Sequence, residues 1–273
     1  MAEKSFTLFH YSLLELRQRD FETAQLDREL WIRTVLSNRL TIPYRGDVEL
    51  EWVPKGNLDE AIYGLLQRQV DHVLHRPPDE GGDEITRTEW QGAYVIIDPT
   101  LHDAGQRIAI ENDVIGRPET LLRYLFRAIN QRIDAPFVGE VEPLFDASTF
   151  WSFVDAHGEE LRFIRFRFVA PNMWGSENEL ERELRNTRKD TGAERVDVRL
   201  TGEEGVDATS DRVSQGVAYA EKGSGRILAR SKDNATYDSD DAPRKTFLEV
   251  IDDTIGVSAQ YLREMKDRIL GRE

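Results

Sequence analysis

The chain has 273 residues, a formal net charge of −15 and no cysteine. The charge excludes a protein whose whole surface coats nucleic acid, because phosphate binding relies on clustered Lys and Arg, so any such site must be local. The lack of cysteine excludes disulfides, thiolate nucleophiles and metal or iron–sulfur sites held by thiolates.

The first half of the chain predicts strands mixed with helices. Alternating or continuous apolar residues predict four strands, at residues 5–16, 47–54, 90–99 and 106–114. Apolar stripes at helical spacing predict two helices, at residues 57–76 and 118–132. Residues 20–40 fit either a helix or a packed loop, and the segment 77–83 predicts a loop between a helix and a sheet.

Pro136 marks the expected boundary between two lobes, residues 1–135 and residues 136–273. Beyond it the sequence predicts strands and helices in turn, with strands at 139–145, 161–169, 194–200 and 226–230 and helices at 147–157 and 176–190. Residues 211–220 fit a helix or a strand, and residues 246–271 predict a long C-terminal helix. The expected fold class is α+β, with two lobes that each hold a mixed or antiparallel sheet with helices packed on one side.

The strand at residues 161–169, LRFIRFRFV, has the clearest pattern in the chain. Ile164, Phe166 and Phe168 share one face, which we expect to enter a core. Arg165 and Arg167 share the opposite face, where their guanidinium groups can meet a ligand.

This second face is the strongest candidate for a binding site of nucleic acid or a protein partner. The candidate residues lie on it or follow it in the chain: Arg165, Arg167, Asn172, Trp174, Arg226 and Arg230. Arginine beside aromatic rings suits stacking on bases and forked contacts to phosphates. The alternative is that these arginines pair with acids on neighbouring strands, and the sequence favours it slightly.

Acidic residues gather at the two strands predicted around residues 90–114. Asp98, His102, Asp103, Glu111 and Asp113 could surround Mg²⁺, as in a metal-dependent nuclease. No lysine lies between positions 55 and 189 to assist such chemistry, and a solvated strand face explains the acids more simply. We therefore predict no metal site and no cofactor, and we keep the nuclease as the alternative function.

The segments FRFVAPN and GVAYAEKGSGRILARS, with a polar helix and a strand between them, carry a resemblance. This half of the chain resembles the C-terminal half of uncharacterised prokaryotic proteins encoded near antiphage defence genes. The resemblance implies an accessory or recognition component of a defence system and supplies no catalytic residues.

The sequence as a whole predicts a non-catalytic intracellular component that recognises nucleic acid or a partner protein. A structural subunit of a homo-oligomer is a third hypothesis, because the predicted C-terminal helix is long enough to pair with a copy of itself. No apolar run approaches the roughly 20 residues that a membrane-spanning helix needs, and no secretory signal is visible. We therefore expect a cytoplasmic protein with no membrane partner.

Overall fold

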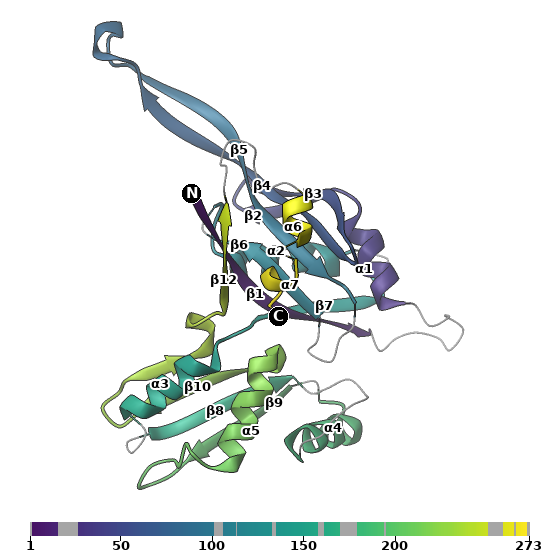
Figure 1. Ribbon diagram of the computed structural model, residues 1–273, viewed down its shortest axis with the longest axis vertical. Helices are drawn as coiled ribbons and strands as arrows, with labels where there is room; N and C mark the ends of the chain where they lie inside the picture. Colours follow the sequence, from purple (N-terminus) through teal and green to yellow (C-terminus); the bar gives the residue numbers. More distant parts are fainter. Residues whose placement is uncertain are drawn as a thin grey trace.

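The computed structural model describes most of the chain: residues 2–15, 27–100, 106–112, 114–132, 135–157, 161–169, 179–193, 195–250, 259–264 and 266–271. These residues form two antiparallel sheets, one of eight strands and one of four, with helices packed against both (Figure 1). The expected α+β class is confirmed. None of the helices in these segments combines the length and the apolar character that crossing a membrane requires.

The larger sheet collects strands from both ends of the chain. Its members are β1 (Ala2–Glu15), β2 (Leu40–Arg45), β3 (Val48–Leu58), β4 (Ala61–His75), β5 (Glu84–Asp98), β6 (Gln106–Glu111), β7 (Phe137–Pro143) and β12 (Lys245–Val250). The order across the sheet is β12-β1-β6-β5-β4-β3-β2, and β7 pairs with β1. Two strands pair with the same edge of β1: β12 pairs with its first half and β7 with its second half.

Both faces of the larger sheet are covered. Helices α1 (Arg28–Leu36) and α2 (Pro118–Asn130) bury their apolar stripes against one face. The short helices α6 (Ala259–Glu264) and α7 (Lys266–Ile269) pack on the other face (Figure 1). Since neighbouring residues on a strand point to opposite faces, strands between two covered faces are apolar at successive positions, as they are at residues 95–97 in β5. Of the segment 20–40, which the sequence left open between helix and loop, Arg28–Leu36 form helix α1 and Leu40 begins β2.

The predicted helix at residues 57–76 is wrong: Leu58 ends strand β3, and Ala61–His75 form strand β4. Ile62, Leu66 and Val70 are spaced by four, and residues four apart share a face in a strand as well as in a helix. Gly64 stands between them against the ring of Trp52, where an added Cβ would lie 2.5 Å from the ring. The sequence pattern alone fits a helix or a strand. Hydrogen bonding of this segment to β3 on one side and β5 on the other makes it a strand.

The predicted long C-terminal helix is also wrong. Its first part is β12, which pairs with Ala2–Thr7 of β1, and its last part forms the two short helices α6 and α7. Residues 251–258 and 265 lie outside the described residues. The first half of β1 needs a neighbour on the edge that β7 leaves uncovered, and a segment distant in sequence supplies those hydrogen bonds.

Strands β4 and β5 continue as a two-stranded hairpin beyond the body of the sheet (Figure 1). The pairing extends to His75 and Glu84, and a 3-10 turn at Pro78–Glu80 joins the two strands. The segment at residues 77–83 is therefore the tip of a hairpin, and not the predicted loop between a helix and a sheet. We call residues 68–91 the arm.

The smaller sheet follows in the second half of the chain. Its strands are β8 (Leu161–Val169), β9 (Arg195–Thr201), β10 (Gly225–Ser231) and β11 (Thr236–Asp238), in the order β11-β10-β8-β9. Helices α3 (Ala147–His157), α4 (Glu179–Thr191) and α5 (Asp211–Tyr219) share a core with one face of this sheet. A π-helical turn at Ala220–Ser224 and a 3-10 turn at Ser239–Asp241 flank β10 and β11.

The division of the chain at Pro136 into residues 1–135 and 136–273 stays a prediction. β7 and β12 follow Pro136 in the sequence and belong to the larger sheet. The chain thus enters the smaller sheet after β7 and returns to the larger sheet at β12. We call the parts built on the two sheets the larger-sheet lobe and the smaller-sheet lobe.

Candidate binding cleft

Strand β8 places its arginines on the face of the smaller sheet that lies opposite the helical core. Ile164, Phe166 and Phe168 are buried in that core, whereas the side chains of Arg165 and Arg167 are each 39% exposed. The faces expected for this strand are therefore those observed. The alternation follows from one covered face and one face open to solvent.

Strand pairing brings further arginines to the same face. Arg167 is the direct partner of Arg226 on β10, and Arg165 is the partner of Arg199 on β9. Directly opposed residues share a face of an antiparallel pair, so like charges meet there. The arginines on this face of β8, β9 and β10 are Arg165, Arg167, Arg195, Arg199, Arg226 and Arg230.

Acids on the same face pair with part of this charge. The Nε atoms of Arg165 and Arg167 both approach Oδ1 of Asp197, at 3.2 and 3.4 Å. Desolvation alone would raise the pKa of the Asp197 carboxyl. Hydrogen bonds from the two guanidinium groups outweigh it, so this pKa lies below its usual value. Arg226 is paired with Asp238 and with Asp240, at 2.7 Å from the latter. Of the four arginines that the sequence predicts for the binding face, Arg165, Arg167 and Arg226 therefore pair with acids, and the first two share a single carboxylate.

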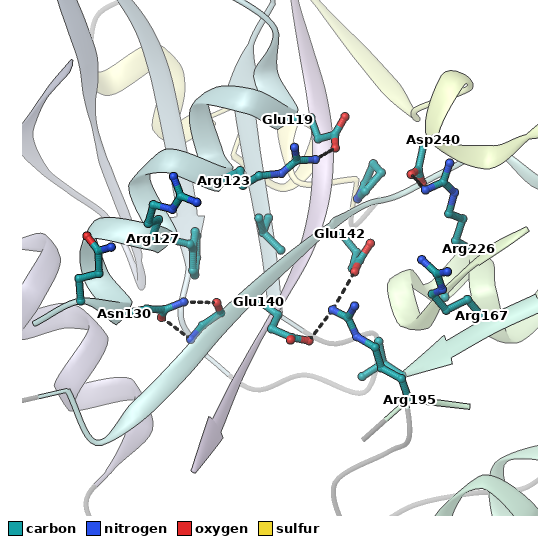
Figure 2. A pocket seen from close by; sticks show the side chains of 17 residues that line it. Glu119, Arg123, Arg127, Asn130, Glu140, Glu142, Arg167, Arg195, Arg226 and Asp240 are labelled. Atoms are coloured by element: carbon teal, nitrogen blue, oxygen red, sulfur yellow. Dashed lines mark hydrogen bonds and ion pairs between the residues drawn. The ribbon is translucent and has the colours of Figure 1, made fainter. Parts of the chain in front are cut away.

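A cleft of about 490 Å³ lies where this face meets the larger-sheet lobe (Figure 2). One wall is helix α2, whose exposed Arg123 and Arg127 face the cleft. The opposite wall is the smaller sheet with Arg167, Arg195 and Arg226. Strand β7 lies between the two walls, so arginines from both lobes surround one cavity.

The arginines of the cleft differ in how firmly they are held. Arg123 is paired with Glu119 one helical turn away. Arg127 lies over the ring of Tyr124, 5.7 Å from its centroid, and makes no ion pair with any described residue. Arg127 is therefore the cation of this wall that a bound anion can engage without displacing an acid.

Carboxylates from β7 form the floor. Arg195 reaches Glu140 at 3.1 Å and Glu142 at 3.5 Å, which ties β9 to β7 across the cleft. Burial raises the pKa of Glu142 despite the neighbouring Arg195. Burial also raises the pKa of Asp240 to about 6, despite its contact with Arg226. Two acids of the cleft thus take up protons more readily than exposed acids do.

The α2 wall is fixed to β7 by a side-chain amide. Asn130 donates from Nδ2 to the carbonyl of Gly139 at 2.9 Å and accepts from the Gly139 N–H at 2.7 Å (Figure 2). The ring of Phe126 lies against Gly139, in the place that a Cβ would occupy. These contacts hold helix α2 in place on β7, so they fix the position of the α2 arginines relative to the floor of the cleft.

The cleft includes only some of the residues expected from the sequence. Arg167 and Arg226 line it, whereas Arg165 and Arg230 lie farther along the same sheet face. Asn172 and Trp174 lie outside the described residues. Sequence reasoning missed Arg123, Arg127 and Arg195, and the outward positions of the first two on helix α2 were the only signal for them.

The expected acidic cluster is spread along a strand pair. Asp98 is opposite Arg107, and Glu111 is beside Tyr94, four residues from Asp98 along β5. Glu111 is buried, pairs with Lys4 at 2.6 Å and accepts a hydrogen bond from the Tyr94 N–H. His102, Asp103 and Asp113 lie outside the described residues. Within the segments that the structure describes, no three His, Asp or Glu side chains come close enough to hold a metal ion.

Comparisons of this chain with protein-family models, with curated proteins and with solved structures found no match. The geometry of the cleft is therefore the main evidence on the function of this chain.

Proposed function

We propose that this chain is a non-catalytic binding component that holds a single strand of nucleic acid in the cleft between its two lobes. The observation that carries the proposal is the set of five arginines from α2, β8, β9 and β10 around one cavity. Planar guanidinium groups bind phosphates in a forked geometry and stack on bases. Elements distant in sequence supply these groups from two walls, which suits a strand that lies along the cleft.

The size of the cleft favours a single strand over a duplex. A cavity of about 490 Å³ is within the range of small-ligand sites, about 300 to 1,000 Å³. A double helix is much wider, since its major groove alone measures about 12 Å. We infer that a few nucleotides enter the cleft and that their phosphates contact both walls.

The net charge of −15 is compatible with such a site because the positive charge is local. Carboxylates at the floor partly balance the arginines, so we expect moderate affinity with a strong dependence on salt. We further propose that the chain acts in a cytoplasmic antiphage defence assembly, because its C-terminal half resembles proteins encoded near antiphage defence genes. The separation of Asp98 from Glu111 gives no support to the alternative, a metal-dependent nuclease.

Fluorescence anisotropy with labelled single-stranded RNA, single-stranded DNA and duplex DNA tests the proposal across a salt series. Strands of about 20 nucleotides exceed the site size of a typical single-strand binding domain. We expect the single strands to bind more tightly than the duplex. The variant Arg127→Gln/Arg167→Gln should weaken binding and reduce the slope of log K against log salt by about 1.4, since each phosphate contact to a single strand contributes about 0.7.

The matched control is Arg39→Gln/Arg162→Gln, which removes the same charge at two exposed positions outside the cleft. This control should bind like the wild type. Equal loss of affinity in both variants would show that only the total charge matters, and the cleft would then have no special role. Absence of binding at low salt would reject nucleic acid as the ligand.

A further inference from the structure

Beyond the body of the larger sheet, the two strands of the arm pair only with each other. Both of its faces are open to solvent from Asp71 on β4 to Thr88 on β5, and it points away from both lobes (Figure 1). A two-stranded hairpin is at best marginally stable alone in water. An arm of this length therefore suggests a surface that is covered in an assembly.

Apolar side chains on the arm support this view. Val73 is 60% exposed and Trp90 is 54% exposed, both on one face, while Leu74 and Ile85 are at least 40% exposed on the other face. Among the described residues, seven large apolar side chains are exposed, and these are four of them. Such a concentration on one projecting element is typical of a contact surface.

The tip of the arm is strongly acidic. Residues 79–84 contain Asp79, Glu80, Asp83 and Glu84 and no basic residue. All of them are exposed, and the turn is built on Gly81 and Gly82 at positive φ. The surface that receives the arm should therefore combine accessible apolar groups with positive charge.

The same chain carries such a surface on the smaller sheet, beyond the cleft. We call it the distal patch, and it consists of Phe163, Arg165, Arg199, Leu228 and Arg230. The guanidinium of Arg199 lies 4.6 Å from the centroid of the Phe163 ring, and Phe163 and Leu228 are half-buried. The Nε of Arg230 is buried and has no hydrogen-bond partner among the described atoms.

The arm and the distal patch of one molecule are far apart. The arm extends from one end of the long axis and the smaller sheet forms the other end (Figure 1). From Arg68 to His75 the arm extends about 24 Å at about 3.4 Å per residue, and it points away from the smaller sheet. The arm can therefore reach a distal patch only on a different molecule.

We propose that the arm of one copy of this chain binds the distal patch of a second copy, so that copies assemble head to tail. The acidic tip faces the arginines of the patch, and Val73 and Trp90, on one face of the arm, cover Phe163 and Leu228. A contact between two different surfaces leaves one of each free on every dimer, so it continues into a ring or a filament. This proposal does not depend on nucleic-acid binding, because the distal patch lies outside the cleft.

Sedimentation velocity on nucleic-acid-free protein tests the proposal, over about 1 to 100 µM, a range suited to micromolar affinities. The wild type should form species larger than dimers as its concentration rises. The arm variant Glu80→Gln/Asp83→Asn/Trp90→Ser and the patch variant Arg165→Gln/Arg199→Gln should each remain monomeric. An equimolar mixture of the two variants should form dimers and nothing larger, because it retains one intact arm and one intact patch.

Two control variants and a check of folding complete the experiment. Asp47→Asn/Glu49→Gln removes acids at exposed positions outside the arm and should assemble like the wild type. Circular dichroism and melting temperature should show that both assembly variants are folded.

A monomeric wild type at the highest concentration, assembly of either variant alone, or a mixture that stays monomeric would overturn the proposal. The cleft variant Arg127→Gln/Arg167→Gln should assemble normally, which separates this outcome from a failure of the nucleic-acid proposal.

Discussion

The two sheets differ in how many of their faces are covered. The larger sheet has helices α1 and α2 on one face and α6 and α7 on the other. The smaller sheet has helices α3, α4 and α5 on one face, and its other face is lined with arginines. The larger sheet therefore serves as a scaffold, while the smaller sheet offers a surface that a ligand can contact.

This difference is visible along single strands. Val95, Ile96 and Ile97 of β5 are all fully buried, as expected between two covered faces. In β8 the buried Phe166 and Phe168 alternate with partly exposed arginines. Substitutions on the two faces of β8 should therefore affect different properties, stability on one face and binding on the other.

The largest effect is expected on the covered face. Phe168→Ala should lower the free energy of unfolding by about 3 to 5 kcal/mol, because it removes a buried ring and leaves a cavity. Phe168 packs against Phe166 and Tyr219, with ring centroids 5.3 Å apart in both cases. Urea denaturation measures the change. A loss below about 1 kcal/mol would mean that this face is not part of a tightly packed core.

A smaller loss is expected where the larger sheet meets α2. Gly139→Ala should cost about 1 to 3 kcal/mol, because the new methyl group would overlap the buried ring of Phe126. Adding Phe126→Leu should recover part of the loss, since the smaller side chain makes room. Urea denaturation of both single variants and the double variant forms a double-mutant cycle, and strictly additive losses would argue against this contact.

Acidification should strengthen binding in the cleft by less than about tenfold, the effect of roughly one pKa unit of interaction. The pKa of Asp240 is raised to about 6 by burial, so this carboxyl is ionised at pH 8 and largely neutral at pH 5. Loss of a negative charge beside Arg226 favours an anionic ligand, so affinity should rise as the pH falls through 6. Anisotropy titrations at pH 8 and pH 5 measure it, and Asp240→Asn should reduce the difference. Glu142, whose pKa is also raised, can account for the remaining difference.

The smallest effect on stability is expected on the open face of β8. Arg165→Gln/Arg167→Gln should change the free energy of unfolding by no more than about 1 kcal/mol per pair, because the ion pairs with Asp197 are exposed. Urea denaturation of this variant and of Phe168→Ala compares the contributions of the two faces of β8 to the free energy of unfolding. A loss comparable to that of Phe168→Ala would show that the arginine face is structural.

Local patterns predicted the elements whose faces differ clearly in polarity. Strand β8 and helix α2 have one apolar face each, so their type and their orientation could be derived from the sequence. Strand β4 could not, because a spacing of four fits two structures and the pairing partners that decide between them are non-local. The same limit applies to β12, which pairs with residues more than 200 positions away.

The candidate site was predictable only in part for a related reason. Arg167 and Arg226 stand out because they belong to recognisable strands of the arginine-rich face. Arg127 is on an ordinary amphipathic helix, and Arg195 begins a strand, so neither has a local pattern that indicates a cleft. Only the packing of the smaller sheet close to α2 and β7 brings these side chains together.

The contact between Asn130 and Gly139 has a consequence for how copies of this chain can meet. Strand β7 is at the rim of its sheet, and at Gly139 both backbone groups that face away from β1 are already occupied by the Asn130 amide. A foreign strand that approached this rim would find neither a free donor nor a free acceptor at that position. At this residue the Asn130 amide makes the two hydrogen bonds that a further strand would make, so it hinders extension of the sheet by β-augmentation.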